Sequence, residues 1–243
     1  MLTLFKYALT WGSIGFLWLI LSPANAQENR HRGTFDVGGD IVNRFYWRGV
    51  NLSESPAIQP YIEYGKGAFT IGAWGSYSFS KEPYQEVDIY ACFQKANVCL
   101  TFNDYFCPSD SIGVSHKYFN WSNSSTTHAV EAILEVSHIY KSPLSFKGGV
   151  FLYGDDKNEV GENCYSTYLE MQCDFQLGEQ PLIALIGCAP FEGAYSDRLA
   201  LVNIGVSAEK DLHFTETVEV PLSIMFAVNP QSESVFMVAG ISF

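Results

Sequence analysis

The chain has 243 residues, of which 14 are basic and 26 acidic, so its formal net charge at pH 7 is −12. This balance argues against nucleic-acid binding, which needs a basic surface. Apolar residues make up 47% of the chain and aromatic residues 15%, yet the mean hydropathy is only +0.03. Apolar and polar residues are therefore interspersed, a composition that favours an all-β protein.

The N-terminus has the three parts of a secretory signal peptide. Lys6 supplies the positive charge, residues 8–21 form an uncharged apolar stretch, and Ala24-Asn25-Ala26 is a small-x-small cleavage site. The apolar stretch is shorter than the roughly 20 residues of a membrane-spanning helix, and no other segment has such a pattern. We expect cleavage after Ala26, which would leave residues 27–243 as one domain with a net charge of −13 after the loss of Lys6.

From residue 34 onward, apolar residues recur at every second position, as in strands with one apolar face. Twelve segments show the pattern: 34–46, 57–64, 69–78, 86–94, 98–106, 129–140, 144–153, 165–176, 182–189, 200–209, 217–229 and 234–243. The sequence therefore predicts an all-β transmembrane antiparallel barrel of twelve strands, an even number as in bacterial outer-membrane barrels.

The predicted connections alternate in length, as expected when short turns face the periplasm and longer loops face outward. The turns at 65–67, 95–97 and 141–143 are short, whereas the outward connection 107–128 is the longest. The last strand ends on Phe243, with apolar residues alternating before it. This ending resembles the C-terminal signal by which the assembly machinery of the outer membrane recognises barrels, which makes that machinery an expected partner.

One face of the predicted strands is almost free of charge, as a lipid-facing surface must be, because a charge at the bilayer midplane costs ~2–4 kcal/mol. The other face carries ten acidic and two basic residues, and we expect it to line a wet lumen. The predicted pore-lining residues are Asp40, Arg44, Glu63, Asp88, Glu131, Glu135, Lys147 and Glu170. Acidic rings favour cations, so weak cation selectivity is expected.

Aromatic residues of the apolar face gather at the predicted strand ends, as in the two aromatic belts of a barrel. The periplasmic belt would comprise Tyr64, Phe69, Phe93, Tyr140, Phe146, Phe175 and Phe243, and the outer belt Phe45, Trp47, Tyr77 and Tyr165. Segments 182–189 and 234–243 are apolar on both faces, which indicates that their inward residues meet a folded-in loop.

Residues 40–60, DIVNRFYWRGVNLSESPAIQP, and the following Gly72-Ala73-Trp74-Gly75-Ser76 resemble the N-terminal signature of the TorF family of porin-like proteins. The signature covers about 40 residues, and beyond Ser78 the similarity rests on the strand pattern and on Phe243. The resemblance implies an outer-membrane barrel more firmly than a transport activity. The six cysteines depart from what this family leads us to expect.

Two features have more than one interpretation. Arg44 and Arg48 could face an acidic wall across the pore, or Arg44 could form a structural salt bridge with Asp40 or Glu63. The loop 107–128 could fold inward as a constriction or lie outside as a surface epitope, and side chains or this loop could close the pore.

The cysteines show no paired CxxC spacing, so we expect no zinc site. A two-residue turn would place Cys92 and Cys99 directly opposite each other, within reach of a disulfide. Cys107 and Cys164 lie at loop bases and could also pair, whereas Cys173 falls on the lipid face.

A lipid hydrolase would need a serine with an activating histidine. His128 lies in a loop near Ser122, and His138 has no serine in register. We expect no catalytic residues, no metal and no cofactor. The sequence therefore predicts passive diffusion of small hydrophilic solutes or ions through a barrel in outer-membrane lipid, and the alternative is a non-conducting structural or adhesive surface barrel.

Overall fold

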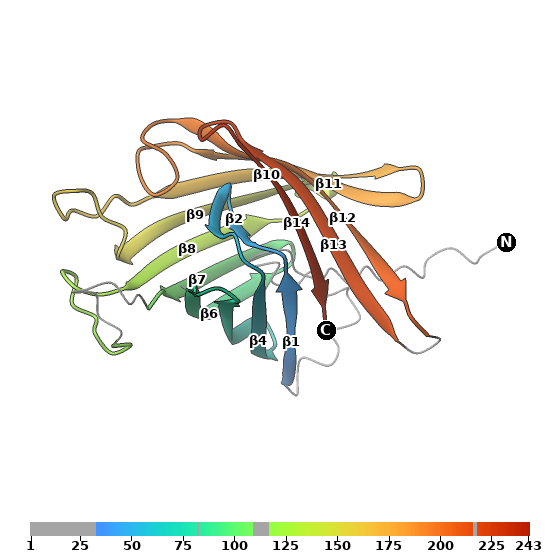
Figure 1. Cartoon of the computed structure of the whole chain (residues 1–243), viewed down its shortest axis with the longest axis horizontal. Coiled ribbons are helices and arrows are strands. Elements are labelled where there is room, and N and C mark those ends of the chain that lie inside the picture. Colours follow the sequence, from blue (N-terminus) through green and yellow to red (C-terminus); the bar gives the residue numbers. More distant parts are fainter. Residues whose placement is uncertain (1–32, 82, 109–116, 216–217) are drawn as a thin grey trace.

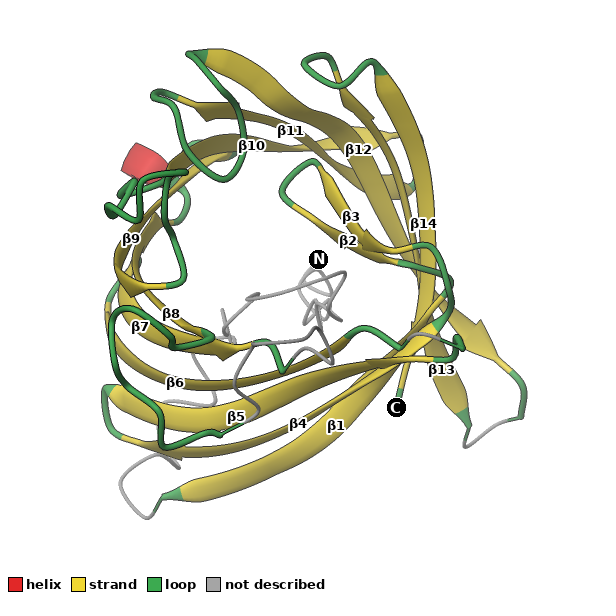
Figure 2. Ribbon diagram, turned by 60° about the vertical axis from the view of Figure 1, so that its left-hand side comes forward, coloured by secondary structure: helices red, strands yellow, loops and turns green. Residues whose placement is uncertain are grey.

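The computed structural model describes residues 33–81, 83–108, 117–215 and 218–243. Twelve strands form one closed antiparallel barrel in which each strand pairs with its neighbours in the chain and β1 pairs with β14 (Figures 1 and 2). These strands are β1 (Thr34–Val42), β4 (Ala57–Lys66), β5 (Phe69–Ser78), β6 (Gln85–Lys95), β7 (Val98–Phe106), β8 (His128–Val136), β9 (Leu144–Gly154), β10 (Thr167–Leu177), β11 (Gln180–Ala189), β12 (Ala200–His213), β13 (Glu219–Asn229) and β14 (Ser234–Ser242). The predicted twelve-stranded barrel is confirmed.

The period-two pattern of the sequence explains the barrel wall, because successive side chains of a strand point to opposite faces. In β6, Glu86, Asp88, Tyr90 and Cys92 are buried and alternate with exposed or half-buried Val87, Ile89, Ala91 and Phe93. The same alternation leaves Phe35 74% and Ile71 55% exposed on the outward face. The barrel therefore presents apolar side chains outward and polar side chains inward.

The two ends of the barrel differ. One end, the turn end, carries the short connections around 67–68, 96–97 and 178–179, and the other, the loop end, carries 79–84, 155–166 and 190–199. The turn after β8 is longer than predicted, because the chain adopts a left-handed conformation at His138 and Tyr140 and forms one 3₁₀ turn, η2 (Ile139–Lys141). No helix in the described part of the chain is long and apolar enough to cross a membrane.

The first predicted strand, 34–46, is wrong at its C-terminal end. The strand stops at Val42, and the chain turns into a two-stranded hairpin made of β2 (Phe45–Trp47) and β3 (Val50–Ser53). This hairpin, residues 45–53, lies inside the ring of barrel strands in Figure 2, and we refer to it as the plug hairpin. Phe45 and Trp47, predicted for an outward belt, are instead packed inside the barrel.

The closing seam between β1 and β14 is much shorter than the other pairings. It has three residue pairs, from Asp40–Ser242 to Val42–Gly240, whereas β1 pairs with β4 along its whole length. The backbone of Phe243 extends the seam through two hydrogen bonds with Gly39, of 3.0 and 3.1 Å. Asn43 ends it, since its side chain accepts a hydrogen bond from the Ala239 amide and donates one to the Met237 carbonyl.

Candidate functional site

The plug hairpin turns on Arg48 and Gly49, which both have positive φ, at 49° and 88°. A two-residue turn of this kind matches the twist of the flanking strands, and glycine suits it best. Gly49 is also pressed against the wall, because a Cβ at this position would lie 1.9 Å from the carbonyl oxygen of Val202. The Asn229 side chain donates a 3.0 Å hydrogen bond to the Gly49 carbonyl. These contacts hold the turn of the plug hairpin in one position against the inner wall of the barrel.

Arg48 forms a buried ion pair across the lumen. Its Nη1 lies 2.6 Å from Oε1 of Glu131 on β8, and its Nη2 lies 3.1 Å from Oε2, so the contact is bidentate. Tyr105 also donates a 2.6 Å hydrogen bond to Glu131 Oε2. Removal of both charges from water is costly, and paired hydrogen bonds of good geometry offset that cost. Gly149 leaves room for the carboxylate, since a Cβ there would lie 2.1 Å from Glu131 Oε1.

Aromatic rings surround the guanidinium group. The Arg48 Cζ atom lies 4.7 Å from the ring centre of Trp47, 5.0 Å from that of Tyr168 and 6.0 Å from that of Tyr195. Arg48 also donates a 2.7 Å hydrogen bond to the Tyr195 hydroxyl. Burial raises the pKa of Tyr195 above its ordinary range. For Arg48, burial lowers the pKa but the charge of Glu131 outweighs it, so its pKa is well above the usual value and the guanidinium stays charged.

A second set of contacts holds the other side of the plug hairpin. The Tyr46 hydroxyl donates a 2.7 Å hydrogen bond to Asn203 Oδ1, and Asn203 Nδ2 donates one of 2.9 Å to the Tyr168 hydroxyl. Tyr168 in turn donates to Glu170. Tyr46 packs on Met225, Ala227 and Val238. Leu185 and Phe236 pack against the same cluster. Inward apolar residues of segments 182–189 and 234–243 therefore meet a folded-in segment, and that segment is the plug hairpin.

Seven of the eight predicted pore-lining residues lie on barrel strands, and they differ in burial and in their partners. Asp40, Asp88, Glu131 and Glu170 are buried inside the barrel, and Asp40 accepts a 2.6 Å hydrogen bond from Ser242. Glu63 accepts one of 2.5 Å from Tyr90. Glu135 and Lys147 face each other on β8 and β9 at 2.7 Å, and Lys147 is also the register partner of Glu170 on β10.

The position of Arg44 agrees with neither interpretation of the pair Arg44 and Arg48. It lies in the bend between β1 and β2 rather than on a strand, and its Nε is buried without a hydrogen-bond partner. Within the described ranges it forms no ion pair with Asp40 or Glu63. The arginine that faces an acidic wall is Arg48, because the plug hairpin carries it into the lumen.

Tyr118 and Trp121 of the long loop pack against Phe106 and His128, at the loop ends of β7 and β8. His128 shares the outward face of β8 with Leu134, yet it is fully buried because Trp121 stacks on it at 3.9 Å. Its Nδ1 lies 2.8 Å from Asp104, and its Nε2 lies 2.6 Å from the Tyr118 carbonyl. Both ring nitrogens are thus engaged away from any serine. His138 lies 3.1 Å from Asp174.

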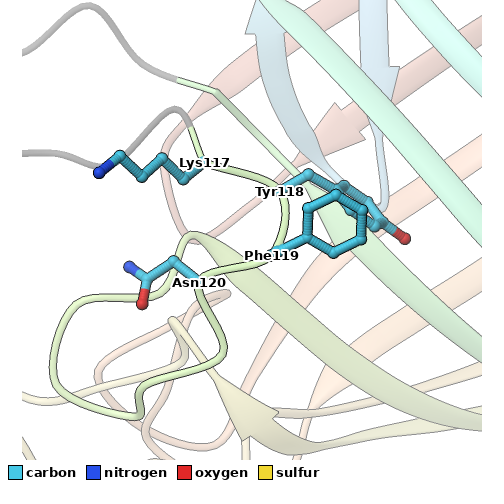
Figure 3. A pocket seen from close by; sticks show the side chains of 4 residues that line it. All are labelled: Lys117, Tyr118, Phe119 and Asn120. Carbon is cyan, nitrogen blue, oxygen red and sulfur yellow. The ribbon is translucent and has the colours of Figure 1, made fainter.

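Beside this loop lies a hollow of about 690 Å³ lined by Lys117, Tyr118, Phe119 and Asn120. Figure 3 shows the two rings of Tyr118 and Phe119 on one side, with Lys117 and Asn120 pointing away from them. The residues come from one loop, and the hollow is open. It has the features of a surface depression rather than of an enclosed binding site.

Three of the cysteine expectations can be compared with the structure. Cys92 and Cys99 form a disulfide, but they are diagonal rather than directly opposite, since Thr101 is the register partner of Cys92. Cys107 and Cys164 are free thiols, as is Cys173 on the outward parity of β10. No three histidine, cysteine or acidic residues in the described ranges are grouped as a metal site would require. Ala26 lies outside the described residues.

The sequence reasoning missed several residues of this interior: Glu86, Asn103, Tyr105, Tyr168 and Tyr195. Glu86 could have been found, because it has the same parity as Asp88 at the start of a predicted strand. The tyrosines could not, because their role depends on the plug hairpin, whose first residues continue the alternating pattern of β1. No model of a known protein family matches the chain, and no curated protein matches it either.

Proposed function

We propose that this chain is an outer-membrane β-barrel that conducts small cations through a lumen narrowed by the plug hairpin. The observation that carries the membrane assignment is the outward face. Large apolar side chains such as Phe35, Phe69, Ile71 and Met237 are more than half exposed there. A closed barrel with an apolar exterior and a polar interior has the partition of residues that a lipid bilayer requires.

The interior supports the channel part of the proposal. Carboxylates outnumber basic groups on the inner face, and rings of acidic side chains favour cations. Side chains fill the lumen around Arg48, where Tyr105, Phe151, Tyr168 and Tyr195 pack together. We therefore expect small conductance steps rather than the large ones of an open porin.

The test is the planar-bilayer conductance of refolded residues 27–243 in a salt gradient. The native protein should give small steps with a cation-leaning reversal potential. The double variant Arg48→Ser with Glu131→Gln removes the anchor of the plug hairpin without leaving a lone charge, and its steps should be several-fold larger. Phe119→Ser, in the exposed loop, is the control and should leave the steps unchanged. Anion preference, or equal steps in the double variant, would contradict the proposal.

The filled interior also favours a second candidate, a non-conducting surface barrel with a structural or adhesive role. Ile133, Glu131 and Tyr168 have no exposed area in the described structure, as expected for a solid core. A folded protein that gives no steps, in both the native form and the double variant, would favour this candidate.

The proposal also covers export and assembly. We propose that the chain is cleaved after Ala26 and that the assembly machinery recognises the strand that ends at Phe243. We also propose that the chain is a member of the TorF family. Phe243 is 67% exposed at the end of the barrel wall, where a partner could reach it. N-terminal sequencing of the mature protein would check the cleavage, and cell fractionation would check its place in the outer membrane.

A further inference from the structure

A cluster of polar side chains inside the barrel has no role in the network of Arg48. It lies on the inner face of four consecutive strands. Glu86 and Asp88 are neighbours on β6, Ser76 on β5 is the register partner of Glu86, and Asn103 on β7 is diagonal to Asp88. Gln59 on β4 reaches the same place, since its Nε2 donates a 3.2 Å hydrogen bond to Ser76.

Four side-chain oxygen atoms of this cluster lack a hydrogen-bond donor in the described structure, and the amide nitrogen of Asn103 lacks an acceptor. Both carboxylate oxygens of Asp88, the side-chain oxygen of Asn103 and that of Gln59 are buried, with no partner in the described structure. The three side chains have at most 1% of their surface exposed. Glu86 is 4% exposed and accepts one hydrogen bond of 2.6 Å, from the Tyr84 hydroxyl.

The described residues supply no positive charge to these carboxylates. Among the described residues, the ion pairs of Arg48 and Lys147 are with Glu131 and Glu135, and none involves Glu86 or Asp88. An isolated buried carboxylate is strongly unfavourable unless it is neutralised by a proton or by a cation. Two adjacent carboxylates make the need for compensation greater.

We propose that Asp88, Glu86, Asn103 and Gln59 bind a divalent cation of the calcium type inside the barrel. Carboxylate and amide oxygens are the ligands of hard cations, and two carboxylates match a charge of +2. Calcium accepts irregular geometry and six to eight oxygen ligands, including bidentate carboxylates, whereas magnesium demands a strict octahedron. The site has two acids rather than three, so bound water would complete the shell. The inference does not require that the barrel conducts.

The cluster offers its own spectroscopic probe. Trp74 and Tyr105 are the register partners of Asp88 on either side. A terbium ion that replaces calcium at Asp88 would be close to both rings, so excitation of these aromatic residues should sensitise its luminescence. Refolded residues 27–243 in detergent would first be freed of metal with a chelator and then titrated with Tb³⁺.

The expected result is saturable Tb³⁺ luminescence that micromolar-to-millimolar Ca²⁺ displaces, together with a Ca²⁺-dependent rise of the thermal unfolding temperature. Asp88→Asn should weaken Ca²⁺ binding at least tenfold. Asn103→Ala, which removes an amide oxygen but no charge, should weaken it less. Asp36→Asn removes an exposed carboxylate of the same barrel wall and should bind as the native protein does.

Three outcomes would overturn the proposal. The first is the absence of any Ca²⁺ or Tb³⁺ effect on the folded native protein, above all if its stability rises only on acidification, which would show that Glu86 and Asp88 share a proton instead. The second is Tb³⁺ binding that Asp88→Asn leaves unchanged while the variant is folded. The third is an equal effect of Mg²⁺, which would contradict the choice of a large, flexible coordination shell.

Discussion

Glu131 and Asp88 are two carboxylates of the same barrel interior, and both have no exposed surface. Glu131 is held by the guanidinium of Arg48 and by the hydroxyl of Tyr105, whereas both oxygens of Asp88 lack a hydrogen-bond partner in the described structure. The comparison shows that burial alone does not define the state of an interior acid. For Glu131 the chain supplies a positive charge on the plug hairpin. For Asp88 the described residues supply none, and we propose that a bound cation compensates its charge.

The largest expected effect comes from breaking the pair of Glu131. Arg48→Met leaves Glu131 buried without a positive partner and should destabilise the barrel by about 3–5 kcal/mol. Urea unfolding of the refolded protein, followed by tryptophan fluorescence, would measure it. The double variant Arg48→Met with Glu131→Gln also removes the unpaired charge of Glu131, so it should be more stable than Arg48→Met alone. A double variant no more stable than the single one would show that packing, rather than charge, dominates.

A smaller loss of stability should follow when the space beside the Glu131 carboxylate is reduced while Arg48 and Glu131 are both kept. In Gly149→Ala the new methyl group would lie 2.1 Å from Glu131 Oε1, so the carboxylate must move off Arg48. We expect a loss of about 1–3 kcal/mol, the usual cost of overpacking. Gly148→Ala is the matched control, because its nearest contacts are 3.3 Å from Leu169 and Phe146 side chains. Equal losses in the two variants would mean that any added methyl group on β9 is harmful.

The smallest effect concerns a third acid, Glu135, whose partner Lys147 is less buried. The side chains of Lys147 and Glu135 are 14% and 17% exposed, so water screens their 2.7 Å contact more than it screens the pair of Glu131. Lys147→Met should therefore cost about 1–2 kcal/mol in unfolding experiments, less than Arg48→Met. It should also shift the reversal potential further toward cations, because it removes a positive charge from the inner face. An unchanged reversal potential would place Lys147 away from the ion path.

Much of the barrel could be predicted from the sequence because period-two alternation is a local signal. Strands such as β5 and β7 have the predicted bounds, 69–78 and 98–106. The plug hairpin could not be recognised in the same way, since Phe45 and Trp47 continue the alternation of β1 past the point where the strand ends. The consecutive aromatic residues Phe45, Tyr46 and Trp47, followed by Arg48-Gly49, were the available signal. Three apolar residues in a row indicate burial on both faces.

The sequence predicts which residues of the interior site face inward. It does not predict which of them contact one another. Asp40, Asp88, Glu131 and Glu170 were placed inside by parity alone. Their partners depend on contacts across the lumen between residues far apart in the chain, such as Arg48 and Glu131, which are 83 positions apart. Parity gives the direction of a side chain and carries no information on what lies across the lumen.

The short closing seam has a consequence for the order in which the barrel folds. In every other pair of neighbouring strands, the two strands follow each other in the chain or, for β1 and β4, are separated only by the plug hairpin. The pair β1 and β14 instead joins residues about 200 positions apart, such as Asn43 and Ala239. Contacts of such high sequence separation carry a large loop-closure entropy and form slowly. With few ladder bonds to compensate for that entropy, closure of the cylinder should be the last folding event. Hydrogen exchange at Gly39 and Ala239 should then be the fastest within the strands.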